Sequence, residues 1–327
     1  MQALQCVTFV TAIAAGVAFT PAPVHAQTQQ KFPSKPVRVV VPNPAGSQGD
    51  ALARMIAQKL SDTWGQSVVV DNRTGGVGTV AGSMVVKAAP DGHTLLQTAG
   101  FSISAVLQAN LPYDPLKDFA GVAQIGIGTQ VLVVAPALGV KSLKDFIALA
   151  KTQPGKVIYG SSAVGTGSHL NGARFALAAG IKMVTVAFKG GPEATIELMA
   201  GRTHYSSVTL FSALPFVKDG KLVAIAVATP QRVPQLPDVP ALAETFPDFK
   251  RPENSTGLLA PAATPRSIRV QISRDVARVL DLPEMKEWLQ GVGYFSAPST
   301  PEEFDSILRA QIETLSRVVT DAGLRPK

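Results

Sequence analysis

Three segments of the chain are rich in glycine, two of them together with small polar residues, in a way that suits the capture of an anion. They are Pro44-Ala45-Gly46-Ser47-Gln48-Gly49, Gly75-Gly76-Val77-Gly78 and Gly165-Thr166-Gly167-Ser168. Each follows a β-branched run and precedes a helical pattern, which predicts a strand-to-helix loop. Such a loop brings free backbone N–H groups and the positive end of a helix to the carboxyl edge of a sheet. Each loop alone is a weak indication, because glycine also serves such turns for steric reasons.

Other chemistries find less support in the sequence. Residues 76–81 match the dinucleotide pattern GxGxxA, but the acidic residue expected about 20 residues later is absent. No GxSxG motif occurs, and the adjacency of Ser168 and His169 does not indicate a nucleophile–base pair. His93, His169 and His204 show no metal-binding spacing. We therefore expect no catalytic residues, no metal site and no cofactor.

The elements around these loops alternate between strand and helix, which predicts an α/β fold with largely parallel sheets. A length of 327 residues favours two lobes, since single cores stop growing beyond roughly 250–300 residues. We expect Asp50 to cap its helix or to favour the helix dipole, with a role near the ligand as the alternative. We expect His93 to lie in a surface turn. The predicted strands are 38–41, 68–70, 94–98, 131–134, 156–159, 184–188 and 222–228, and the helices are 50–60, 80–88, 143–151, 169–179, 194–200, 268–280 and 304–319.

The first residues predict export. Residues 7–22 are apolar or small, and the small-x-small sequence Val24-His25-Ala26 marks a cleavage site, so residues 1–26 read as a signal peptide. Cys6, the only cysteine, lies within it, so the mature chain would have no thiol or disulfide. The net charge of +7 favours anionic ligands. Basic residues are scattered and aromatic content is 6%, so we expect no nucleic-acid partner.

Several further segments, in this order, carry a family resemblance that spans the mature chain. Together they resemble the substrate-binding proteins of tripartite tricarboxylate transporters, the Bug family. The segments are Pro33-Ser34-Lys35-Pro36, Leu111-Pro112-Tyr113-Asp114-Pro115, Lys117-Asp118-Phe119, Lys189-Gly190, Leu236-Pro237-Asp238-Val239-Pro240, Gly257-Leu258-Leu259-Ala260-Pro261 and Ser299-Thr300-Pro301-Glu302-Glu303-Phe304.

The resemblance implies a type II periplasmic binding protein, with two Rossmann-like lobes that close over one ligand in the cleft between them. Residues 27–130 and 237–327 would form the first lobe and residues 131–236 the second. The function implied is that of a monomeric periplasmic receptor, not an enzyme, that captures a small organic carboxylate for the permease subunits of a transporter. The alternative function is that of an extracytoplasmic ligand sensor for a two-component system, with a sensor kinase as its partner. An exported hydrolase would need a nucleophile, base and oxyanion set that the sequence does not offer.

In the family, backbone amides, small side chains and ordered waters hold the ligand carboxylate, and no arginine clamps it. Carried over by position, the resemblance implies three pocket loops and two additional contacts. These residues are Asn43, Ala45, Gly46 and Ser47, then Thr98, Ala99, Gly100 and Phe101, then Gly165, Thr166, Gly167, Ser168 and His169, with Phe188 and Val208 in addition.

Val208 leads to a hypothesis about the ligand. Many relatives carry an acidic residue at this position, where it could meet a ligand ammonium or hydroxyl. A buried, unpaired ammonium costs several kcal/mol, whereas an apolar group beside Val208, Phe188 and Phe101 gains from burial. We therefore expect a carboxylate with an uncharged or aromatic tail, and not an amino acid. The alternative is that Val208 only packs within a strand.

Export gives the first testable prediction. The intact mass of the protein recovered from the periplasm should correspond to a chain that begins near Gln27. A product that retains Met1, or one that carries lipid on Cys6, would contradict this prediction.

Overall fold

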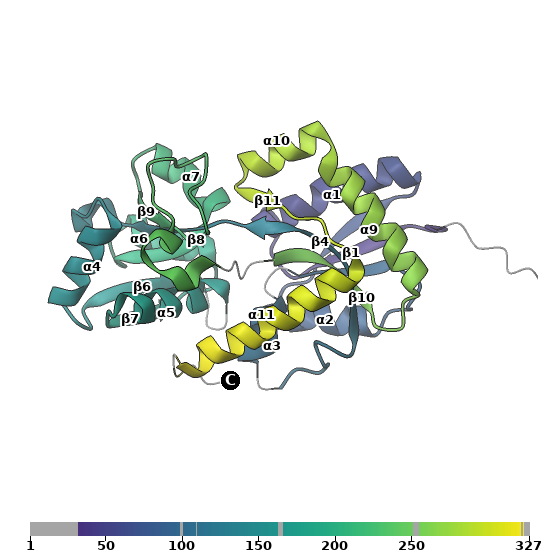
Figure 1. Cartoon of the computed structure of the whole chain (residues 1–327), viewed down its shortest axis with the longest axis horizontal. Helices are drawn as coiled ribbons and strands as arrows, with labels where there is room; N and C mark the ends of the chain where they lie inside the picture. Colours follow the sequence, from purple (N-terminus) through teal and green to yellow (C-terminus); the bar gives the residue numbers. More distant parts are fainter. Residues whose placement is uncertain are drawn as a thin grey trace, which may run out of the picture. The chain divides into compact units, whose positions relative to one another are not determined.

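Two β-sheets with helices on both faces make up the computed structural model (Figure 1). It describes residues 32–98, 101–108, 110–162, 166–250, 255–321 and 323. Phe32–Lys327 forms one compact unit. The predicted signal peptide, including Cys6, lies outside the described residues.

The first sheet has the strand order β11-β4-β10-β3-β1-β2. Strand β1 is parallel to β2 and β3, whereas β10 is antiparallel to β3 and β4, and β11 is antiparallel to β4. The strands are β1 (Val37–Val41), β2 (Val68–Asn72), β3 (Thr94–Gln97), β4 (Phe119–Gly128), β10 (Ser255–Pro261) and β11 (Tyr294–Ser296).

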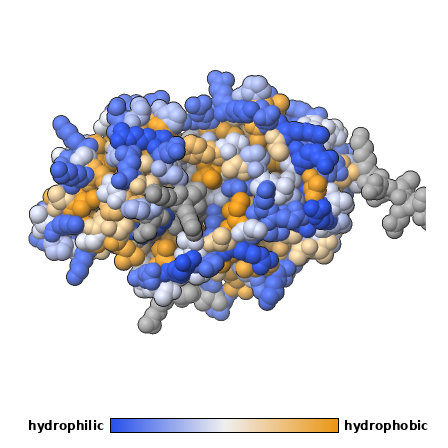
Figure 2. All heavy atoms as spheres, in the orientation of Figure 1, coloured by the Kyte–Doolittle hydropathy of each residue, from blue (hydrophilic) through white to orange (hydrophobic). Residues whose placement is uncertain are grey.

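Side-chain alternation along β1 produces the two cores of this sheet. Val37, Val39 and Val41 join one core with the helices α1 (Gln48–Trp64), α9 (Arg266–Asp281) and α10 (Pro283–Gly291). Val40 faces the opposite side, in the core formed with α2 (Thr79–Val86), α3 (Phe101–Leu107) and α11 (Pro301–Asp321). Helix α11 runs along this sheet, and its outward side is hydrophilic (Figures 1 and 2).

The second sheet has the order β7-β6-β8-β5-β9, and side-chain alternation again produces a core on each of its faces. Along β5, Leu132 and Val134 face one core and Val131 and Val133 the other. Helices α4 (Leu143–Thr152) and α5 (Gly167–Ala179) cover the first face, and α6 (Gly191–Met199) and α7 (Leu210–Lys218) the second. The strands are β5 (Gln130–Val134), β6 (Val157–Ser161), β7 (Met183–Ala187), β8 (Tyr205–Thr209) and β9 (Val223–Val227), and the short helix α8 spans Leu242–Thr245.

The expectation of largely parallel sheets is right only for part of each sheet. The chain leaves the first sheet at the end of β4 and enters the second as β5, with Thr129 between them, and β5 is antiparallel to both of its neighbours. After β9 the chain returns as β10, again antiparallel to its neighbours. The exact lobe boundaries remain a prediction.

The expectation for His93 was also wrong. Its side chain is buried, its Nε2 atom accepts the Ser34 N–H at 3.2 Å, and its ring lies 4.9 Å from that of Phe32. His93 thus lies in the bend before β3, but its side chain points into the protein and not to the surface.

Helices of the two sheets also meet. Ile103 and Leu107 of α3, Leu170 of α5, and Leu315 and Val319 of α11 form one buried apolar cluster. Among the described helices, none combines the length and the apolar character needed to cross a bilayer.

Candidate functional site

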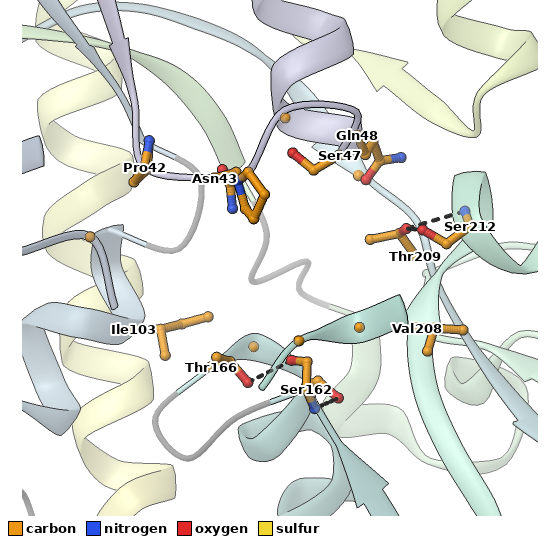
Figure 3. Close-up of a pocket in the computed structure, with 18 of the residues that line it drawn as sticks. Pro42, Asn43, Ser47, Gln48, Ile103, Ser162, Thr166, Val208, Thr209 and Ser212 are labelled. Carbon is orange, nitrogen blue, oxygen red and sulfur yellow. Dashed lines mark hydrogen bonds between the residues drawn. The ribbon is translucent and has the colours of Figure 1, made fainter. Parts of the chain in front are cut away.

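A cavity of about 540 Å³ is lined by residues that belong to both sheets and their connecting loops. Figure 3 shows Asn43 and Ser47 on one side of it, and Ser162 and Thr166 on the other. Val208 and Thr209 border a third side. The volume is in the range of small-molecule sites, which are usually about 300–1,000 Å³.

Several helices begin at this cavity. The N-cap residues Ser47 of α1, Thr166 of α5, Gly190 of α6 and Thr209 of α7 all line it. The first N–H groups of a helix have no partner within the helix, and the helix dipole gives that end a partial positive charge. The cavity is therefore surrounded by donors suited to an anion.

The loop before α1 is held by a reciprocal cap. Ser47 Oγ accepts the N–H of Asp50 at 3.3 Å, and Asp50 Oδ2 accepts the N–H of Gly46 at 2.9 Å. Gly46 has a φ of +78°, which glycine adopts without strain. The N-cap of α1 is therefore Ser47 and not Asp50, which lies in the first turn, where its negative charge favours the helix dipole and its carboxylate holds the loop that carries the cap. The N–H groups of Gln48 and Gly49 are left without partners inside the helix.

The same carboxylate has a perturbed acidity. Burial raises the pKa of Asp50, but hydrogen bonds from Arg54, Gly46 and Asn72 together lower it more, so the pKa lies below its usual value. The Nδ2 atom of Asn72 donates to Asp50 Oδ1 and to the carbonyl oxygen of Asn43, each at 3.0 Å. Asp50 therefore holds the loop that lines the cavity through hydrogen bonds, but it does not line the cavity itself.

The loop before α5 is held by hydroxyl groups. Thr166 Oγ1 accepts the N–H of His169 at 3.4 Å and lies 3.0 Å from Ser162 Oγ. Ser168 Oγ donates to the carbonyl oxygen of Ser207 at 2.9 Å, and the hydroxyl of Tyr159 donates to the Ser168 carbonyl. These bonds fix the first turn of α5, whose Gly167 N–H has no partner within the helix.

The lining is almost free of charge. Among the described lining residues, Lys189 is the only one that is charged at neutral pH, and none is acidic. Burial raises the pKa of Tyr294 to about 12, so this side chain stays neutral. An anion would therefore be held by neutral donors and helix ends, with one exposed lysine at the edge.

The structure brings most of the predicted residues together. Asn43, Ala45, Gly46, Ser47, Thr98, Phe101, Thr166, Gly167, Ser168 and Val208 line the cavity. Ala99, Gly100 and Gly165 lie outside the described residues. His169 and Phe188 are not among the residues that line the cavity, although both are next to or near residues that do. Val208 also packs in a core cluster, and its role in selecting the ligand stays a prediction.

Other lining residues were not predicted as site residues. Lys189 and Gly190 precede α6, and Gly191 and Pro192 begin it. Together they repeat the glycine-rich pattern at a helix start, so the sequence did carry a signal for them. Ser255, Thr256, Tyr294 and Gln311 come from β10, β11 and α11, far from the glycine-rich loops in sequence. No local motif marks them.

Comparisons with known proteins agree with this geometry. The family model described as "Tripartite tricarboxylate transporter family receptor" matches residues 52–324. The chain belongs to this family. The resemblance to Bug proteins is also confirmed. The chain is 31% identical to protein BugT of Bordetella pertussis over 317 residues, and this alignment covers 96% of the chain and 95% of BugT.

Solved structures of similar proteins support the two-lobed fold of the receptor. R. palustris Rpa4515 with adipate is 31% identical, with a TM-score of 0.84 over 90% of this chain and 100% of that one. MatC from Rhodopseudomonas palustris with bound malate is 28% identical, with a TM-score of 0.76 over 88% and 100% of the two chains. The expected periplasmic binding-protein fold is therefore confirmed.

The role of Asp50 can be tested by its pH dependence. Asp50→Asn should lower the free energy of unfolding at neutral pH by about 1–2 kcal/mol, because it weakens the cap and a charge-assisted hydrogen bond. The folded-state pKa lies below the unfolded value of about 3.9, so the contribution is fully present above that value and is lost as the pH falls through the folded pKa. Denaturant unfolding from neutral to acidic pH measures the difference, which should shrink in acid.

Asp62→Asn is the matched control, since Asp62 lies exposed on the same helix. It should change the free energy of unfolding by less than about 0.5 kcal/mol. Equal effects of the two substitutions, or a difference that does not depend on pH, would contradict the assigned cap.

Proposed function

We propose that this protein is a periplasmic receptor that captures a small organic carboxylate for a tripartite tricarboxylate-type transporter. The observation that carries the proposal is the cavity of about 540 Å³. It is surrounded by the first residues of helices that pack on both sheets, and no acidic side chain of the described residues lines it. A carboxylate accepts the N–H groups that the helices cannot satisfy themselves. The similar proteins solved with adipate and malate support this ligand class.

Binding without catalysis is part of the proposal. Ser168 precedes a histidine in the sequence, but its hydroxyl donates to the Ser207 carbonyl and not to a base. A serine nucleophile needs a base that accepts this proton. The Ser168 hydroxyl instead holds the first turn of α5 against β8, which is a structural role.

The charge of the lining also limits the ligand. An ammonium group in this cavity would meet positive helix ends and no described carboxylate. Leaving a buried charge unpaired costs several kcal/mol. Apolar contacts from Phe101, Ile103 and Val208 favour a hydrocarbon body. We therefore propose that the receptor rejects amino acids.

We propose that the receptor delivers its ligand to a membrane permease, which its membership of the family supports, and the alternative partner is a sensor kinase. We propose that the mature receptor acts as a monomer. We propose that the chain crosses between its two lobes near residues 130 and 236. Closure of the lobes around the cavity would then bury the ligand.

Binding of matched acids to the purified mature chain tests this function. Adipate, malate or another small organic acid should raise the melting temperature, since a ligand at 100 times its Kd stabilises by about 2.7 kcal/mol. α-Aminoadipate should bind at least about 100-fold more weakly than adipate, because its ammonium has no counter-charge in the cavity. Isothermal titration calorimetry measures both affinities. Tight binding of the amino acid, or no binding of any organic acid, would contradict the proposal.

The site itself is tested by Gly167→Leu. The bulky side chain in the first turn of α5 should abolish binding of the acid and leave the circular dichroism spectrum unchanged. Gly291→Leu is the matched control, because a side chain there meets open space. Unchanged affinity of the Gly167 variant would show that the acid binds elsewhere.

A further inference from the structure

A buried network of neutral side chains forms part of the cavity wall away from the glycine-rich loops. Ser102 Oγ donates to Gln311 Oε1 at 3.1 Å, and Gln311 Nε2 donates to Ser255 Oγ at 2.7 Å. Gln124 Nε2 donates to the same Ser255 oxygen at 3.0 Å. Ser102, Ser255 and Gln311 line the cavity, and all four side chains belong to residues that are no more than 9% exposed.

The hydrogen count at Ser255 leaves one proton unused. A serine hydroxyl has one O–H donor and two acceptor lone pairs. The amides of Gln311 and Gln124 occupy both lone pairs of Ser255 Oγ. The hydroxyl proton is therefore left for another acceptor, and Ser255 Oγ donates no hydrogen bond to any described residue. Ser102 differs, because its own proton is already donated to Gln311.

The fold holds this donor in place. Ser255 begins β10, where it is paired with Ile127 of β4, and two amide groups fix the direction of its oxygen. A buried donor without a partner destabilises the protein, because it has lost its hydrogen bond to water. Since Ser255 borders the cavity, an acceptor in the cavity can remove this penalty.

We propose that the Ser255 hydroxyl donates a hydrogen bond to a second acceptor group of the bound acid, at a position distinct from the carboxylate at the helix starts. Gln311 and Gln124 are positioning residues, because they act on the ligand only through the Ser255 oxygen. This inference rests on the proposed function and deepens it. It changes the expectation of an uncharged or aromatic tail to that of a tail that bears an oxygen acceptor, whether charged or neutral.

The chemistry of this donor defines what it can select. A hydroxyl proton binds a carboxylate oxygen or a neutral carbonyl oxygen, but it cannot pair with an ammonium, which has donors only. A terminal methyl group would leave the proton unpaired in a buried site. Ser255 thus favours ligands with an oxygen acceptor at the second end, whether or not that end is charged.

Three acids of equal length separate these cases. Adipate ends in a second carboxylate, adipamate in a neutral amide, and hexanoate in a methyl group. We expect the wild-type receptor to bind adipate and adipamate more tightly than hexanoate. In Ser255→Ala the affinity for adipate should fall about 10-fold or more and that for adipamate about 3-fold or more, with hexanoate nearly unchanged. Calorimetry of the purified mature chain measures all three, and succinate, succinamate and butyrate repeat the test at a shorter length.

Two control variants test whether the effect is specific to the Ser255 hydroxyl. Ser102→Ala should change adipate and hexanoate affinity by the same factor, because its proton is not available to the ligand. Ser306→Ala, an exposed hydroxyl on α11, should change neither. If Ser255→Ala weakens all three acids equally, or leaves the preference for adipate intact, the inference is wrong while the proposed function stands. If the wild type binds none of the six acids, the proposed function is contradicted, and the inference about Ser255 that rests on it falls as well.

Discussion

Unpaired N–H groups at the starts of α1, α5, α6 and α7 are the constraint on which the site depends. A helix cannot satisfy its own first N–H groups, and these four helices all begin at the same cavity. Side-chain caps from Ser47, Thr166 and Thr209 satisfy some of these groups and leave others. A ligand that accepts several hydrogen bonds completes what the fold leaves open.

The two sheets explain why the donors converge. Strand alternation places apolar residues on both faces of each sheet, so helices must cover both faces. Parallel strand–helix units then bring their loops to the carboxyl ends of the strands. Because β4 and β5 carry the chain from one sheet to the other, loops of both sheets border one cavity. Neutral donors in such a cavity bind a carboxylate without the desolvation penalty of a buried arginine.

The order of most strands and helices could be predicted from the sequence, because hydrophobic periodicity is a local signal. The glycine-rich loops at Gly46 and Gly167 were found in the same way, since their spacing follows from the strand-to-helix turn. The burial of His93 and the antiparallel strands could not be predicted, because they depend on contacts between distant segments. Ser255 and Gln311 are 56 residues apart and meet only in the folded chain.

We propose separate sources for specificity and affinity. In this proposal the helix starts bind the carboxylate that all ligands of this class share, and the rest of the cavity wall distinguishes their other ends. Phe101 and Val208 contribute apolar surface, and Ser255 contributes one oriented proton. The absence of acidic residues from the described lining then acts against ammonium groups.

Backbone amide NMR during titration with an organic acid tests the central claim most directly, because it observes the proposed N–H donors themselves. If helix starts hold the carboxylate, the amide protons of Gly49, Gly167 and Ser168 should show the largest downfield shifts as binding saturates. Small shifts at these amides, with the main change at the Lys189 side chain, would show that a charge pair holds the ligand and would contradict the account.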